Sequence, residues 1–186
     1  MNRRLSVVVL ALATVVVLAI KWAPAADREK LDLKSLSDSD LKTMSLRFER
    51  SRCYGSCPSY SITVQGDGTV EYVGKDNVKT KGSQKANVDA ATLRKLASEF
   101  AKADFFSLAD FSEENCKGTV CTDMPTVTTE LSLKSETRKM THYYGCRTAP
   151  KALWDLESAL DKLLNTEQWT GDVSKQGPFG TTCFNH

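Results

Sequence analysis

Residues 52–60 read RCYGSCPSY and hold two cysteines four positions apart, with Gly55 between them and Pro58 directly after the second. Such a pair can serve in redox catalysis, in half of a zinc site or in a disulfide. Reactive pairs are usually Cys-x-x-Cys at a helix N-terminus, where the helix dipole lowers the thiol pKa. Here the spacing is one residue longer and Pro58 leads into a strand. The residues therefore favour a closed Cys53–Cys57 disulfide, in which Gly55 lets the chain turn back.

Four further cysteines, Cys116, Cys121, Cys146 and Cys183, bring the total to six. An even number in an exported chain is typical of a disulfide framework. Proximity predicts a second local bridge, Cys116–Cys121, which leaves Cys146 to pair with Cys183. That last bridge closes the largest ring, so losing Cys183 should lower the melting temperature more than losing the 116–121 pair. An unpaired Cys183 that links two chains is the alternative.

A zinc site is a competing interpretation, because the Cys116/Cys121 pair could form a second knuckle beside the first pair. Disulfides compete for the same thiols outside the cytoplasm, and only His142 and His186 could complete the set of ligands. We therefore expect no metal and no cofactor.

His142 shares a predicted strand face with Met140 and Tyr144, which is the usual setting of a histidine at the edge of a core. It could act as a general base if a nucleophile and an orienting acid lay nearby. Asp123 is a candidate for that acid, although an Asp before Met-Pro more often caps a turn. The sequence has no Gly-x-Ser-x-Gly or other nucleophile motif, so no catalytic residue is assigned.

Tyr143, Tyr144 and Arg147 lie together before the last predicted helix. Exposed aromatic and arginine side chains favour binding, although core and capping roles are the commoner ones for residues in such positions. We treat His142, Tyr144, Arg147 and Asp123 as candidate binding residues.

The elements that must position these residues follow from the hydrophobic pattern. Alternation of apolar and polar residues predicts strands over 42–50, 59–65 and 69–73, and a weak polar strand at 77–81, with Gly66-Asp67-Gly68 closing the first hairpin. The alternation returns over 126–134, and a tight turn at Ser135-Glu136 leads to a partner strand over 137–144.

Two helices carry an apolar stripe. The first begins after Val88-Asp89, with Asp89 as N-cap, and ends near Asp104; aromatic residues of 105–111 then fold back as core. The second follows Thr148 and carries Leu153, Leu156, Leu160 and Leu163. Four strands, a helix, two strands and a helix (β4-α-β2-α order) predict an α+β fold. Its antiparallel sheet has about six strands, and two amphipathic helices are packed on one face.

Residues 1–25 have the order of an export signal: Arg3 and Arg4, an apolar run over 5–20 and then Ala-Pro-Ala, which predicts cleavage before Ala26. The alternative is an uncleaved N-terminal membrane anchor. Residues 26–40 form a polar lead-in, 41–171 a single α+β domain, and 172–186 a C-terminal tail tied down by a disulfide. We expect a periplasmic or secreted protein, or one anchored in the inner membrane and facing the periplasm.

The charge balance excludes one class of partner. The 25 Lys and Arg against 23 Asp and Glu give a net charge of +2, and cleavage would remove three of the basic residues and none of the acidic ones. No basic stripe with interleaved aromatic residues remains, so the chain is not expected to bind nucleic acid. No strand–glycine loop–helix unit for a nucleotide is present either.

The motif Cys-Tyr-Gly-Ser-Cys-Pro-Ser-Tyr at 53–60, with Gly-Asp-Gly-Thr-Val at 66–70 and the leucine-rich last helix, resembles the bacterial "domain of unknown function 6438" family. The resemblance covers about 42–171. It implies an exported or lipid-anchored protein and brings no activity with it. This chain departs from the pattern because it has no lipid-attachment cysteine and adds four cysteines beyond the motif.

The sequence as a whole predicts an exported, disulfide-stabilised small domain with a structural or binding role in the cell envelope and an unidentified partner or ligand. The alternative is an extracytoplasmic enzyme, either a hydrolase using His142 or a thiol–disulfide oxidoreductase using Cys53 and Cys57.

Overall fold

The described part of the chain comprises residues 32–33, 35–118 and 120–171 of a computed structural model, and it contains six strands. The strands are β1 (Ser45–Arg50), β2 (Ser59–Gln65), β3 (Thr69–Asp76), β4 (Gly82–Asn87), β5 (Thr126–Leu133) and β6 (Glu136–Tyr143). The two long helices are α2 (Ala90–Lys102) and α3 (Lys151–Leu163). Three single turns complete the elements: α1 (Asp38–Leu41), η1 (Phe105–Ser107) and α4 (Glu167–Thr170).

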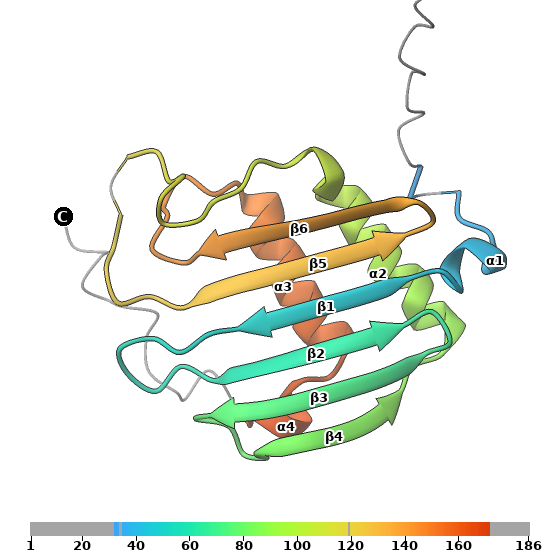
Figure 1. The fold of residues 1–186 in the computed structure, drawn as a ribbon, viewed down its shortest axis with the longest axis horizontal. Helices are drawn as coiled ribbons and strands as arrows, with labels where there is room; N and C mark the ends of the chain where they lie inside the picture. The colour runs from blue at the N-terminus through green and yellow to red at the C-terminus, as the bar shows by residue number, and fades with distance from the viewer. Residues whose placement is uncertain (1–31, 34, 119, 172–186) are drawn as a thin grey trace, which may run out of the picture. The chain divides into compact units, whose positions relative to one another are not determined.

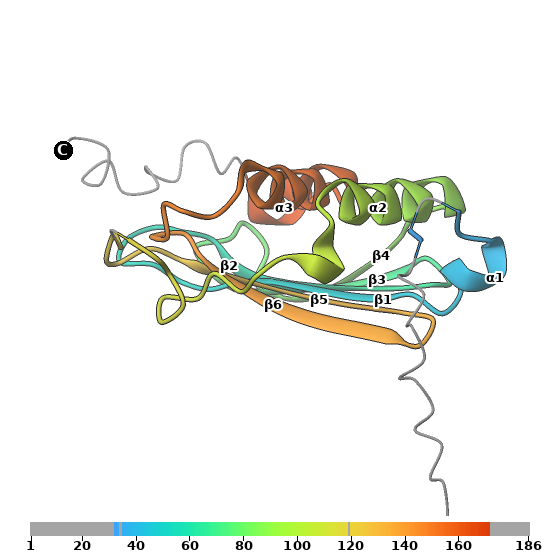
Figure 2. The ribbon, with the colours of Figure 1, turned by 90° about the horizontal axis from the view of Figure 1, so that it is seen from above.

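The strands form one antiparallel sheet in the spatial order β4-β3-β2-β1-β5-β6 (Figure 1). Helices α2 and α3 lie over one face of the sheet (Figure 2). The predicted α+β fold, with an antiparallel sheet of six strands and the chain order of four strands, helix, two strands, helix, is confirmed. The spatial order departs from the chain order at one point, because β5 returns beside the first strand and not beside β4.

Residues 77–81 do not form the predicted fourth strand but connect β3 to β4, which begins at Gly82. Asn77 adopts a positive φ of 51° and ends β3. The N–H groups of residues 79–80 then donate to carbonyl groups of α4, at 3.2 and 2.8 Å. This turn is therefore held by α4, which is distant in the sequence, and the polar sequence of residues 77–81 does not indicate this contact.

The core lies between the sheet and the two long helices. The predicted stripe of α2 is buried throughout, as are Leu153, Leu156 and Leu160 of α3, whereas Leu163 is only partly buried. Alternate residues of β5 face the same core, as the sequence pattern predicts. On α3, Glu157 departs from the apolar pattern, because it is buried between the leucines.

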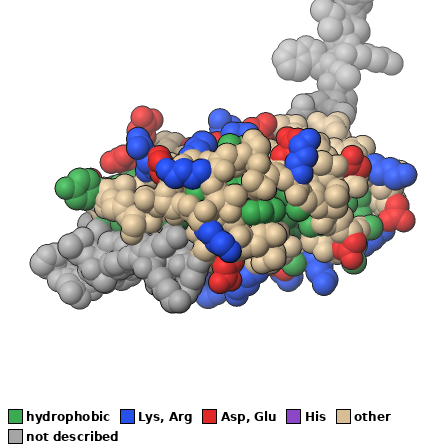
Figure 3. Space-filling view, turned by 90° about the horizontal axis from the view of Figure 1, so that it is seen from below, with side chains coloured by type: hydrophobic (Ala, Val, Ile, Leu, Met, Phe, Trp, Pro, Cys, Tyr) green, Lys and Arg blue, Asp and Glu red, His purple; other side chains and the backbone are tan. Residues whose placement is uncertain are grey.

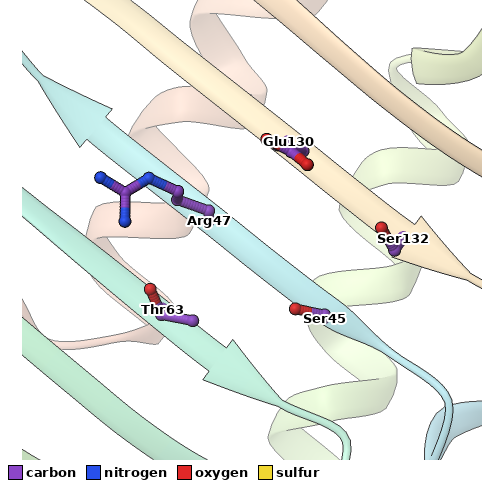
Figure 4. Close-up of a pocket in the computed structure, with 5 residues that line it drawn as sticks. All are labelled: Ser45, Arg47, Thr63, Glu130 and Ser132. Atoms are coloured by element: carbon purple, nitrogen blue, oxygen red, sulfur yellow. The ribbon is translucent and has the colours of Figure 1, made fainter.

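The opposite face of the sheet carries short hydroxyl side chains and mixed charges. Ser45, Arg47, Thr63, Glu130 and Ser132 line a shallow hollow of about 210 Å³ on this face, where Arg47 extends away from Glu130 (Figure 4). From the β4 edge, basic and acidic side chains are intermixed over the surface (Figure 3). The described surface thus shows no broad patch of one charge from this side, which agrees with the absence of a basic stripe in the sequence.

The chain enters the domain at one end of the sheet, through α1. Ser37 caps α1 and exchanges hydrogen bonds with Asp40 in a capping box, and Leu41 is buried. Among the described residues, no helix has both the length and the apolar composition needed to cross a membrane. The predicted signal or anchor at 1–25 and the predicted tail at 172–186 lie outside the described residues.

Candidate functional site

Three loops gather at one end of the sheet, and we call this region the loop end (Figure 1). It comprises residues 51–58 between β1 and β2, residues 108–118 and 120–125 before β5, and residues 144–150 between β6 and α3. Antiparallel pairing brings these loops together, because β1 and β6 end at this edge while β2 and β5 begin there. Every cysteine among the described residues lies in one of the three loops.

The predicted Cys53–Cys57 disulfide is confirmed, with 5.6 Å between the two Cα atoms. Gly55 lies inside the ring at φ 145°, a conformation that a residue with a side chain rarely adopts. Cys57 is buried, whereas Tyr54 at the tip of the ring is 89% exposed. The ring therefore holds a large aromatic side chain in solvent on a closed turn.

The second disulfide joins Cys116 to Cys146, with 5.5 Å between the Cα atoms. The predicted pairs Cys116–Cys121 and Cys146–Cys183 are therefore wrong. The segment before β5 runs along β6, where Phe111 forms a parallel bridge with His142, and this contact carries Cys116 to the end of β6. Cys121 is also disulfide-bonded, and Cys183 lies outside the described residues.

Backbone hydrogen bonds join the loops to one another. The Tyr54 N–H donates to the Asp123 carbonyl at 3.1 Å, and the Cys121 N–H donates to the Gly145 carbonyl at 2.9 Å. A Cβ atom at Gly145 would lie 2.0 Å from the Cys121 carbonyl oxygen, so this close approach requires glycine. Covalent and main-chain contacts thus fix the loop end, which has little secondary structure of its own.

A polar network beneath the loop end connects the sheet to α3. Arg50 donates from Nη2 to Asp161 Oδ2 at 2.6 Å and from Nη1 to the Tyr144 hydroxyl at 2.6 Å. Tyr60, which pairs with Arg50 in the sheet, donates its hydroxyl to Asp161 Oδ1. Arg50 and Tyr60 flank the loop that carries the first disulfide. The network therefore fixes the stem of that loop to the helix, and Tyr144 extends it to the loop after β6.

Burial and neighbouring charges set the protonation of this network. Burial raises the pKa of Tyr60 well above its usual value, and the nearby Asp161 carboxylate raises it further, while Arg50 opposes both. The pKa of Tyr144 is also raised, first by burial and then by the negative charge of Glu157. Burial lowers the pKa of Arg50, but the attraction of Asp161 and its neighbours outweighs this and raises it well above its usual value. The two tyrosines are therefore neutral and the guanidinium is charged around neutral pH.

The histidine singled out by the sequence belongs to the buried end of the same region. His142 Nδ1 lies 2.8 Å from Glu157 Oε1, and both side chains are 1% exposed. The imidazole packs edge-on against Trp154, with 4.5 Å between the ring centroids, and lies 4.9 Å from the Tyr144 ring. Glu157, and not Asp123, is thus the acid that contacts His142. A histidine held by a carboxylate is half of a general-base arrangement, but this one has no exposed surface for a substrate to reach.

The four candidate binding residues fall into two places. His142 and Tyr144 are buried and in contact, under α3. Arg147 and Asp123 are exposed on two different loops of the loop end, and Asp123 adopts a positive φ of 66°. The first two therefore lie beneath the loop end, and the other two lie on its surface.

Sequence reasoning missed the charged members of the network. Arg50 follows Leu46 and Phe48 in the same strand phase, so its position already predicted a core-facing side chain. Glu157 and Asp161 lie four residues apart on α3, and Glu157 follows Leu153 by one helical turn. The sequence signal that could have identified these residues is a charged residue at a position where the periodicity of the strand or helix predicts an apolar, core-facing one.

No group of three or more His, Cys, Asp or Glu side chains that could hold a metal ion occurs among the described residues. The zinc interpretation required thiolates from the pairs 53/57 and 116/121, and all four of these cysteines are in disulfides. The exposed side chains of the loop end include those of Tyr54, Asp123 and Arg147.

Comparison with known proteins places the chain in a family. A search of curated proteins finds no match. The family described as "Domain of unknown function (DUF6438)" matches residues 44–164, a range that runs from the residue before β1 to the residue after α3. It includes all six strands, the three loops of the loop end and the network beneath them. Because this range covers well over half of the sequence, the chain belongs to the Domain of unknown function (DUF6438) family.

Proposed function

We propose that this chain is an exported, disulfide-stabilised domain of the cell envelope that binds a partner through the loop end and carries out no catalysis. The observation that carries the proposal is Tyr54, which is 89% exposed at the tip of a closed ring. Tyrosine, tryptophan and arginine dominate the binding energy of protein interfaces. An aromatic side chain that is fixed in solvent is suited to that role.

The rigidity of the loop end supports the same proposal. Ordering loops on binding costs free energy, and a surface that is ordered beforehand avoids this cost. Here the 53–57 ring, the Cys116–Cys146 bridge and the Arg50–Asp161 network fix three loops before any partner arrives. The exposed Asp123 lies next to the ring, because its carbonyl accepts from the Tyr54 N–H, and the exposed Arg147 lies on another loop of the loop end; both offer polar groups to a partner.

Disulfides form and persist in oxidising compartments, which supports export. The location is the periplasm or the medium, or the periplasmic side of the inner membrane if the first 25 residues remain as an anchor. Mass spectrometry of the protein from its host distinguishes these cases. We expect a mature chain that begins at Ala26. An intact Met1 in the membrane fraction would show instead that residues 1–25 remain as a membrane anchor.

Two enzymatic alternatives are weaker on the geometry of the site. A hydrolase that uses His142 would need a substrate path to a side chain that is 1% exposed. A thiol–disulfide oxidoreductase usually places its reactive cysteine at a helix N-terminus, and Cys53 and Cys57 lie in a loop between two strands.

Photo-crosslinking from position 54 tests the proposal. A benzophenone-bearing phenylalanine replaces Tyr54 in producing cells, and the same residue at Val73, which is 37% exposed in β3, is the matched control. We expect a crosslinked partner from position 54 and none from position 73. Equal products at both positions, or none at position 54, would contradict the proposal. Tyr54→Ala should keep the melting temperature, because its side chain contributes little to the core, and it should abolish binding of the crosslinked partner in a pull-down with the purified chain.

A further inference from the structure

An attacking thiol would approach the Cys53–Cys57 disulfide from the side of Cys53. Cys57 is buried, while Cys53 is partly exposed and is followed by three exposed residues. Apart from Gly55 and its chain neighbours Tyr54 and Ser56, the described atom that lies within 4 Å of a Cβ built on Gly55 is Cys53 Sγ, at 3.8 Å. Glycine at this position therefore leaves the flank of that sulfur clear for an incoming thiol.

The bridge between Cys116 and Cys146 also joins a partly exposed cysteine, Cys116, to a buried one, but a hydroxyl group lies beside both of its sulfurs. Cys146 is fully buried, and the Thr148 hydroxyl lies 3.4 Å from Cys146 Sγ and 3.9 Å from Cys116 Sγ. Thiol–disulfide exchange depends on access to the attacked sulfur. In the 53–57 bridge the partly exposed sulfur, Cys53 Sγ, has Gly55 beside it, which carries no side chain, so we expect an incoming thiol to meet less obstruction there.

The 53–57 bridge should stabilise the fold less than the 116–146 bridge does. Its ring spans five residues, so it constrains the unfolded chain less than the 30-residue separation of Cys116 and Cys146 does. The stem of the loop is held separately, since the Ser51 N–H donates to the Thr126 carbonyl at 2.9 Å and the Thr126 N–H donates to Ser51 Oγ at 2.8 Å.

The tip of the loop has weaker support. Tyr54 N–H donates to the Asp123 carbonyl at 3.1 Å, and Asn77 Nδ2 donates to the carbonyls of Gly55 and Cys57 at 3.3 and 3.2 Å. A hydrogen bond in water contributes no more than the ordering of about one residue costs. Opening the ring therefore loosens the tip that carries Tyr54 while the stem and the sheet stay in place.

We infer that Cys53–Cys57 is a reversible redox switch that controls the presentation of Tyr54. This inference rests on the proposed function, because what the switch controls is the binding surface. A thiolate of a dithiol reductant attacks Cys53 Sγ, the S–S bond breaks, and its electron pair leaves on Cys57 Sγ, which takes up a proton. The second thiol of the reductant then attacks the mixed disulfide and releases Cys53. The reductant becomes a disulfide, the protein gains two thiols, and a disulfide oxidant reverses the step.

Graded reduction of the full exported chain with dithiothreitol tests the switch. Quenching with iodoacetamide and peptide mass spectrometry identifies the opened bridge, far-ultraviolet circular dichroism follows the fold, and hydrogen exchange follows the Tyr54 N–H. We expect alkylation at Cys53 and Cys57 to be roughly tenfold faster than at Cys116 and Cys146, because the Thr148 hydroxyl lies beside both sulfurs of the second bridge and exchange depends on access to the attacked sulfur. The circular dichroism should stay unchanged, and exchange of the Tyr54 N–H should accelerate by roughly tenfold.

The Cys53→Ser, Cys57→Ser double variant is the matched control, since it should show the fast Tyr54 exchange without reductant. The switch would be overturned if the 53–57 bridge is reduced only when the circular dichroism signal is also lost. It would also be overturned if hydrogen exchange of the Tyr54 N–H is unchanged after reduction. Both readouts are independent of any partner. If reduction leaves crosslinking from position 54 intact, the switch fails and the binding surface stands. If the oxidised protein gives no crosslink at all, the proposed function fails, and the exchange data still decide whether the ring controls Tyr54.

Discussion

Two buried tyrosines on the helix-facing side of the sheet should respond differently to loss of the hydroxyl group. Tyr60 and Tyr72 are 1% and 0% exposed, and their ring centroids are 5.7 Å apart. The Tyr60 hydroxyl donates to Asp161 and accepts from Arg50 Nε at 3.1 Å. The Tyr72 hydroxyl has no hydrogen-bond partner among the described residues, and burial raises its pKa to about 12. Tyrosine to phenylalanine removes the same atom at both sites.

The magnitudes follow from the partners. A hydrogen bond to a charged group contributes about 1.5–3 kcal/mol. Arg50 and Asp161 keep their contact with each other when Tyr60 is changed, so we expect Tyr60→Phe to lower the free energy of unfolding by about 2 kcal/mol. Tyr72→Phe relieves the desolvation of an unpaired hydroxyl, and we expect it to be neutral or to stabilise by up to about 1 kcal/mol.

Urea unfolding of the oxidised protein, followed by circular dichroism, measures both changes. With a slope of about 2 kcal/mol per molar urea, Tyr60→Phe should lower the midpoint by about 1 M, and Tyr72→Phe should leave it unchanged or raise it slightly. The slope should be the same for both variants, because neither changes the surface that unfolding exposes. Equal destabilisation by the two substitutions would refute the reasoning, because it would show that the network contributes nothing beyond burial of the ring.

Three further outcomes are expected. Replacing Cys116 and Cys146 by serine should lower the free energy of unfolding by about 3.6 kcal/mol, against about 2 kcal/mol for the 53–57 pair. Thermal or urea unfolding that reverses this order would contradict the loop-entropy argument. Cys121 is disulfide-bonded while the other four described cysteines pair with one another, so non-reducing peptide mapping should find it joined to Cys183; a reductant-sensitive dimer would show the interchain alternative instead. Tyr60, Tyr72 and Tyr144, three of the five tyrosines, have a raised pKa in the folded protein. Their full contribution to stability is therefore present below pH ~10, the pKa of tyrosine in the unfolded chain, and it is lost as the pH rises through their pKa values in the folded protein. Melting temperatures measured across this range should fall, and a flat profile would contradict the shifts.

Much of the fold could be read from local pattern. The alternation in β1, β2 and β5 and the stripes of the two helices gave each element its buried face, and Asp89 caps α2 as its position predicted, accepting from the Thr92 N–H at 2.7 Å. Gly55 likewise predicted the closed 53–57 ring, because only a short turn brings two cysteines so near in sequence within disulfide distance. These features depend on neighbours within a few residues, which the sequence displays directly.

The sequence by itself determined the α+β class, the order of the elements and the faces on which Arg50, Glu157 and Asp161 lie. Only the tertiary structure decided what those residues meet, because Arg50 and Asp161 are 111 residues apart and come together when α3 packs on the sheet. The same holds for Cys116, whose partner is 30 residues away and not five, since the hydrogen bonds of the segment beside β6 outweigh proximity along the chain. Local pattern fixes which way a side chain points, whereas its partner depends on how separate elements pack, and that packing is a property of the whole chain.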